Sequence, residues 1–118
     1  MKRVTIALVF STALVALAGC SSYESSPFTG TWGEDAAGEP SLTIEDDGTF
    51  AGNDGCNDFE GEGTISGDTF TFGPFATIQQ ACEGVTPWLN IAVTATVDGD
   101  TLTVYKSNGD EIGTLDKR

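Results

Sequence analysis

The thiols are the most reactive side chains of this 118-residue chain, which has three cysteines and no histidine. Without an imidazole the chain cannot assemble a Ser–His or Cys–His nucleophile, nor a metal site that needs histidine. Cys56 and Cys82 could form a disulfide, remain buried free thiols, or supply two thiolates to a metal ion. We predict the disulfide, because a zinc site with two thiols would need carboxylates as its other ligands. On the chain-entropy account, this bond stabilises a fold by roughly 3–4 kcal/mol.

Carboxylates are the other side chains that could act chemically. They gather in two stretches: Asp46 and Asp47, then Asp54, Asp58, Glu60 and Glu62. A carboxylate pair in a cleft could serve a wall-glycan hydrolase as acid and base, and converging carboxylates could bind a cation. Both functions are alternatives, because acidic clusters on exposed turns are usually solvated. We therefore predict no catalytic residue, no metal site and no cofactor.

The segment 52–61 is the most distinctive stretch of the chain, because it is rich in glycine and asparagine around a cysteine and a phenylalanine. Such residues tolerate tight and left-handed backbone, so the segment predicts a bulge between two strands, fastened by Cys56. The functional alternative is a loop that presents Asn57 and Asp58 to a ligand. These two are the candidate binding residues.

The N-terminus has the organisation of an export signal. Lys2 and Arg3 precede an uncharged, mostly apolar run over 4–18, which is short for a membrane-spanning helix. The run closes on Leu-Ala-Gly-Cys, which looks like the lipobox of bacterial lipoproteins. We therefore expect 1–19 to be a signal peptide and Cys20 to carry lipid. The protein would then be anchored at the extracytoplasmic face of the cell membrane; an uncleaved anchor and ordinary secretion are the alternatives.

Residues 20–28 are mostly small and polar and include a proline, so they predict a short flexible tether between the lipid and one domain over 29–118. Cleavage would remove Lys2 and Arg3 but no acidic residue, which takes the formal charge from −13 to −15. Such a charge repels nucleic acid and anionic headgroups, so we expect no nucleic-acid partner. An envelope protein or a wall component is the partner we expect. The charge could attract cations, but solubility is the simpler explanation. The sequence does not determine the oligomeric state.

Apolar residues alternate with threonine along most of the chain, and Asp-Gly, Gly-Asp and Asn-Gly pairs separate the runs. This pattern is typical of short strands joined by tight turns. It predicts strands at 29–33, 41–45, 49–53, 58–65, 69–73, 94–98, 101–105 and 111–115. The fold class is therefore mainly β, as a small antiparallel sheet or a partly closed barrel. We expect an aromatic core made of Trp32, Phe50, Phe59, Phe70, Phe72, Phe75 and Trp88.

One segment departs from the strand pattern. Thr86 could be an N-cap, with Pro87 at the first helical position. The residues that follow place Trp88, Leu89, Ala92 and Val93 on one helical face. We expect a short helix that ends near Val93 and plugs the sheet.

Two cysteine elements carry a family resemblance. The first is Gly55-Cys56-Asn57 with Phe59 and Gly61, and the second is Thr77 with Ala81-Cys82. Together with Gly30-Thr31-Trp32 and the hairpin that begins at Asp98-Gly99-Asp100, they resemble the META domain of HslJ-like envelope proteins. The chain departs from the family at Gln79-Gln80, where methionine is common, and in a shortened helix that lacks an acidic residue.

The resemblance implies a compact β-rich domain with a helix, of a kind linked to envelope stress, secretion-related motility and drug tolerance. It implies no catalytic residues. The function we expect is that of a non-catalytic module, tethered at the membrane, that binds or stabilises a cell-surface partner.

Overall fold

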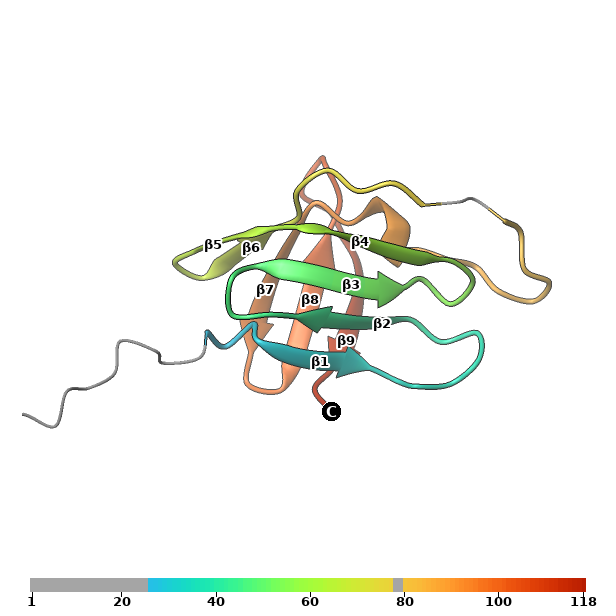
Figure 1. Cartoon of the computed structure of the whole chain (residues 1–118), viewed down its shortest axis with the longest axis horizontal. Coiled ribbons are helices and arrows are strands. Elements are labelled where there is room, and N and C mark those ends of the chain that lie inside the picture. Colours follow the sequence, from blue (N-terminus) through green and yellow to red (C-terminus); the bar gives the residue numbers. More distant parts are fainter. Residues whose placement is uncertain (1–25, 78–79) are drawn as a thin grey trace, which may run out of the picture.

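The computed structural model describes residues 26–77 and 80–118. Its strands form two antiparallel sheets (Figure 1). Sheet A has the order β1 (Gly30–Gly33), β2 (Ser41–Ile44), β3 (Thr49–Asn53) and β4 (Asp58–Glu62). Sheet B has the order β5 (Thr64–Ser66), β6 (Thr69–Thr71), β7 (Thr94–Asp98), β8 (Thr101–Tyr105) and β9 (Glu111–Asp116). The mainly β class is confirmed. The predicted signal peptide, Cys20 and most of the tether lie outside the described residues.

The hairpins follow the sequence signals closely. In β2 and β3, Ile44 pairs with Phe50, and both side chains point into the core. The turn between them is closed by Asp47, whose Oδ1 accepts the backbone N–H of Thr49 at 2.9 Å. Hydrogen bonds from the side chain and backbone of Thr49 lower the pKa of Asp47 from its ordinary value. Gly48 has φ +90°, a conformation that a side chain would strain.

The predicted strand 58–65 is wrong in one respect, because it breaks at Gly63 into β4 and β5. At this position the chain leaves sheet A and enters sheet B. The backbone N–H of Gly63 donates to the carbonyl of Gly48 at 2.9 Å. A side chain at Gly63 would collide with the ring of Phe70. The break therefore needs a glycine, and the strand pattern alone did not predict it.

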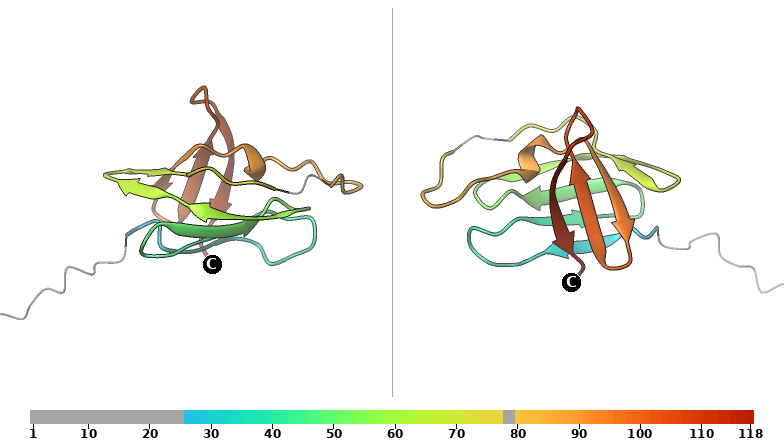
Figure 2. Two further views of the ribbon diagram at one scale, coloured as in Figure 1. Left: turned by 45° about the horizontal axis from the view of Figure 1, so that its top comes forward. Right: turned by 180° about the vertical axis from the view of Figure 1, so that it is seen from behind.

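The sheets also meet on the opposite side, between β1 and β9. Trp32 forms an antiparallel bridge with Lys117, and the N–H of Arg118 donates to the carbonyl of Thr31 at 2.9 Å. Strands β7, β8 and β9 run steeply across the strands of sheet A (Figure 2). The result is two sheets joined at both sides but not closed into a barrel. The antiparallel β architecture is confirmed, and it consists of two sheets where we expected one sheet or a partly closed barrel.

The core lies between the two sheets and is strongly aromatic. The ring of Phe50 is at its centre, with four neighbours at centroid distances of 5.1–6.3 Å: Phe59, Phe70, Phe72 and Phe75. Of the seven predicted core aromatics, Phe75 and Trp88 are only half-buried but pack against the cluster, and the others are buried. Phe28, which we assigned to the tether, is 1% exposed and accepts the Trp32 Nε1–H at 2.9 Å through its carbonyl. The domain therefore begins at or before Phe28.

The predicted helix is a single 3-10 turn, η1 (Leu89–Ile91), and the described residues contain no α-helix. Its N-cap is Trp88, with no side-chain cap, so Thr86 does not have the capping role we predicted. The helix ends early because Val93 is already part of the sheet hydrogen bonding. Its N–H donates to Tyr105 and its carbonyl accepts from Phe72, each at 2.9 Å. Leu89 and Ala92 are buried, as expected. In the described part of the chain, no helix has the length and apolar character needed to cross a membrane.

Candidate functional site

The turn between β3 and β4 is built around Asp54. Its Oδ1 accepts the backbone N–H groups of Cys56 at 2.9 Å and Asn57 at 2.6 Å. Its own N–H donates to the carbonyl of Asn57 at 3.0 Å, and Gly55 provides φ +101°. Asp54 is only 2% exposed, which corrects the expectation of a solvated carboxylate at this position. The other carboxylates of this stretch are exposed as expected: Asp58, Glu60 and Glu62. The Asp54 carboxylate organises the loop, and its Oδ2 is buried without a partner among the described residues.

Asn57 fastens this turn to a distant segment. Its Nδ2 donates to the carbonyl of Gln80 at 3.1 Å, and its Oδ1 accepts the N–H of Gln80 at 3.2 Å. The side-chain amide thus pairs with Gln80 as one peptide group pairs with another in a sheet. Asn57 is 9% exposed. Its polar atoms are therefore engaged within the fold.

The disulfide between Cys56 and Cys82 fastens the same two segments, with the Cα atoms 5.7 Å apart. The predicted pairing is present in the structure. The Sγ of Cys56 lies 3.0 Å from the carbonyl oxygen of Gln80. Because a disulfide sulfur has no hydrogen to donate, this is a packing contact. Together, the disulfide and the Asn57 pairing hold the long connection between β6 and η1, whose described residues form no helix or strand before η1.

Asp58, the second candidate binding residue, lies at the start of β4 and is exposed. Its Oδ1 accepts a hydrogen bond from Asn53 Nδ2 at 2.8 Å. The two candidates therefore face different surroundings: Asn57 points into the fold and Asp58 faces solvent. Ligand binding by either residue stays a prediction.

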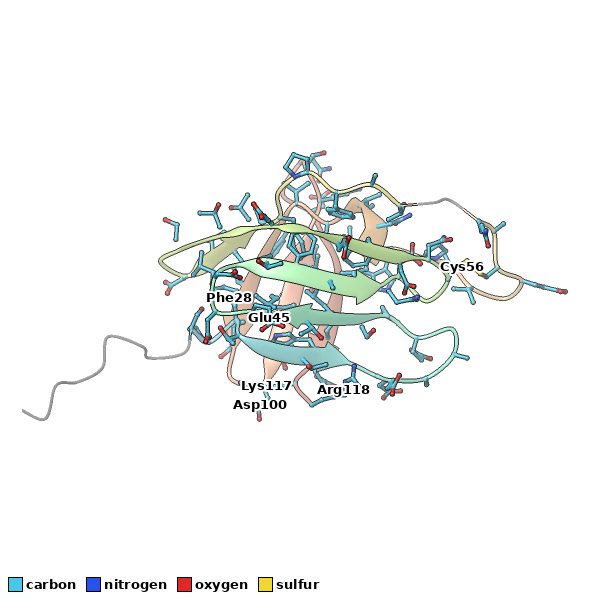
Figure 3. All side chains as sticks on the ribbon, viewed as in Figure 1. Phe28, Glu45, Cys56, Asp100, Lys117 and Arg118 are labelled. Carbon is cyan, nitrogen blue, oxygen red and sulfur yellow. A yellow bond between two sulfur atoms is a disulfide. The ribbon has the colours of Figure 1, made fainter. Side chains whose placement is uncertain are left out.

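A hollow of about 460 Å³ lies beside this turn, and we call it the acidic hollow. The loop between β1 and β2 approaches the turn here, at the end of sheet A where Figure 3 labels Cys56. Carboxylates and both disulfide cysteines line it: Glu34, Asp35, Glu39, Asp58, Cys56 and Cys82. No lysine or arginine is among its lining residues. The hollow combines strong negative charge with access to the disulfide.

Two further hollows differ in character. One of about 500 Å³ borders β3 and β4, where Phe59 and Glu60 contribute to its wall. The other, of about 430 Å³, lies beside η1 and is lined by Phe72, Phe75 and Ile91 among others. Ile91 is 51% exposed. Among the described residues there is no group of three or more cysteine and acidic side chains placed to hold a metal ion.

Two contributors to this region escaped the prediction. Asp54 could have been recognised, because Asp followed by Gly-Cys-Asn is a pattern in which the carboxylate accepts backbone N–H groups of its own turn. Gln80 could not, since it takes part through its backbone alone. The acidic hollow needs the fold as well, because the β1–β2 loop is distant in sequence from Cys56 and Cys82.

Comparison with known proteins is informative at the level of the family. A family model described as the META domain matches residues 15–118. No curated protein and no solved structure matches the chain at a significant level. The family resemblance seen in the cysteine elements is therefore confirmed.

Proposed function

The chain belongs to the META domain family, and we propose that it works as a non-catalytic module of the bacterial cell envelope. In this proposal, lipid on Cys20 holds the domain at the extracytoplasmic face of the membrane, where it binds or stabilises an envelope partner.

The proposed location at the membrane rests on the N-terminal sequence, which has the organisation of an export signal followed by a lipobox. The signal and lipobox consist of two basic residues, an uncharged apolar run and a cysteine preceded by small residues. Since Phe28 is already buried in the domain, few residues separate Cys20 from the domain. From Cys20 to Phe28 a fully extended chain spans at most about 25–30 Å. A lipidated protein with this tether would work close to the bilayer surface.

The use of polar side chains supports a non-catalytic role. In the segment 52–61, the carboxylate of Asp54 accepts hydrogen bonds from backbone N–H groups of its own turn. The side-chain amide of Asn57 pairs with the backbone of Gln80. The disulfide occupies the two thiols of the domain. The remaining carboxylates of this region, such as Asp58, lie on the exposed surface. This arrangement favours a rigid scaffold whose surface recognises a partner.

Metabolic labelling with an alkyne fatty acid tests the anchor. The wild-type chain should incorporate the label and sediment with membranes. Cys20→Ser should lose the label and leave the membrane fraction, because only the cysteine sulfur accepts the diacylglycerol. The matched control Ser22→Ala, two positions along the tether, should behave as wild type.

Two outcomes would contradict the proposal. Label that persists in Cys20→Ser would place the lipid elsewhere, and an unlabelled wild-type protein would remove the anchor. The carboxylate-enzyme alternative is tested separately with purified wall glycan. Release of soluble fragments by the wild-type protein, above that of a heat-denatured sample, would favour a hydrolase over a binding module.

A further inference from the structure

The Cys56–Cys82 disulfide is open to the acidic hollow. Both cysteines are half-buried, and both line it. The opposite wall is the β1–β2 loop, which brings Glu34, Asp35 and Glu39 to the same space. A thiol that approaches the disulfide through this hollow must therefore pass these carboxylates.

The charges around the disulfide are not balanced within the hollow. Glu34, Asp35 and Glu39 are exposed, and no side-chain hydrogen bond or ion pair engages them in the described part of the chain. None of the three basic residues of the domain lines the hollow: Lys106 follows β8, and Lys117 and Arg118 are at the seam with β1. The local potential at the disulfide is consequently negative.

Thiol–disulfide exchange is sensitive to such a potential, because the attacking species is the thiolate anion. A thiol with a carboxylate brings two negative charges into the hollow when it attacks. A thiol with an ammonium group brings no net charge, so the carboxylates oppose it far less.

We propose that the acidic hollow makes the Cys56–Cys82 disulfide an exchange site selective for cationic thiols, whether small molecules or proteins with basic residues beside their cysteine. The attacking thiolate forms a new S–S bond to one cysteine while the Cys56–Cys82 bond breaks, and the other cysteine leaves as a thiolate that takes a proton from water. A second thiolate then attacks the mixed disulfide. This second step joins the two attacking thiols in a disulfide and releases the remaining cysteine as a thiolate. Two thiols are therefore oxidised for each protein disulfide reduced. This selectivity is independent of the proposed anchor.

Reduction kinetics of the full-length chain in a non-ionic detergent test the proposal. The reductants are cysteamine, 2-mercaptoethanol and 3-mercaptopropionate, with rates expressed per thiolate. Peptide mapping after alkylation scores Cys56 and Cys82 alone. At about 0.01 M ionic strength we expect cysteamine to react roughly tenfold faster than 3-mercaptopropionate, and at about 1 M the ratio should fall to about twofold.

Two variants with the same change in net charge separate a local from a general effect. Glu34→Gln with Asp35→Asn and Glu39→Gln neutralises the hollow, and should reduce the ratio to about threefold at low salt. Asp68→Asn with Asp98→Asn and Glu111→Gln neutralises exposed carboxylates that do not line it, and should leave the ratio unchanged.

The proposal is overturned if the hollow variant keeps the wild-type ratio, or if the control variant loses it equally. A reduction rate independent of thiol concentration would also overturn it, because reduction would then wait for unfolding. The salt dependence of the wild-type ratio tests the proposal even if a variant fails to fold.

Discussion

At the scale of single residues, neighbouring polar side chains in the β3–β4 turn have opposite roles. Asn57 is engaged with Gln80 inside the fold, whereas Asp58 is exposed and its side chain accepts a hydrogen bond from Asn53. From the sequence, both residues were predicted to lie on one loop, and their roles could not be distinguished. The reason is that the hydrogen-bond partner of Asn57 is a backbone group far along the chain. The sequence did identify the two cysteines, since their pairing depends on chemistry and count more than on fold.

Substitution of these two residues should therefore differ in its effect on stability. Asn57→Ala removes two hydrogen bonds and should lower the free energy of unfolding by about 1–3 kcal/mol. Asp58→Ala, the matched control, should change it by no more than about 0.5 kcal/mol. Urea denaturation of the oxidised proteins measures both. Equal and small effects would mean that Asn57 does not fasten the segment around Gln80.

Asp47 predicts a dependence on pH. Hydrogen bonds from Thr49 lower the pKa of this carboxyl in the folded protein below 3.8, so the ionised form is favoured by folding. Its contribution is present above pH 3.8 and is lost as the pH falls through the lower folded pKa. The melting temperature of Asp47→Ala should therefore lie below that of wild type at pH 7, and the difference should shrink below pH 3.8. A difference that is constant with pH would contradict this role.

At the scale of elements, the alternation of apolar residues and the turn residues were sufficient to predict most strands. They did not predict where a strand breaks or where the two sheets meet. Period-two alternation places apolar side chains on one face of a strand whatever its partner strand is. A strand can therefore be predicted from its own residues alone. The break at Gly63 depends on the nearby ring of Phe70, and the early end of η1 depends on the hydrogen bonds of Val93 to other strands. These are tertiary contacts, which no local pattern contains.

The seam between β1 and β9 makes a prediction at this scale. A chain that ends at Asp116 loses the Arg118 N–H bond to Thr31 across the seam and, within sheet B, the Lys117 N–H bond to Asp100. Its free energy of unfolding should fall by about 1–3 kcal/mol. The double variant Lys117→Ala with Arg118→Ala keeps both backbone bonds and loses the cation over the Trp32 ring. Its free energy of unfolding should fall by no more than about 1 kcal/mol. If the truncated and alanine proteins unfold alike, the backbone seam does not join the sheets.

At the scale of the whole molecule, the domain is a small scaffold with an aromatic core and a strongly negative net charge, for which we propose a lipid tether at a membrane. The fold class and family could be predicted from the chain itself, because they depend on strand patterning and on two cysteine elements. The acidic hollow could not, because it forms only when the β1–β2 loop meets the disulfide. Within the proposed role, the negative charge would keep the domain away from anionic headgroups.

The most direct test of the proposed role is the intact mass of the mature protein purified from the envelope. The account predicts a chain that begins at Cys20, carries diacylglycerol on that residue, and has the mass of two hydrogens less than the reduced chain because of the Cys56–Cys82 bond. A mature chain that starts at another residue, or that begins at Cys20 without lipid, would contradict the membrane-tethered module.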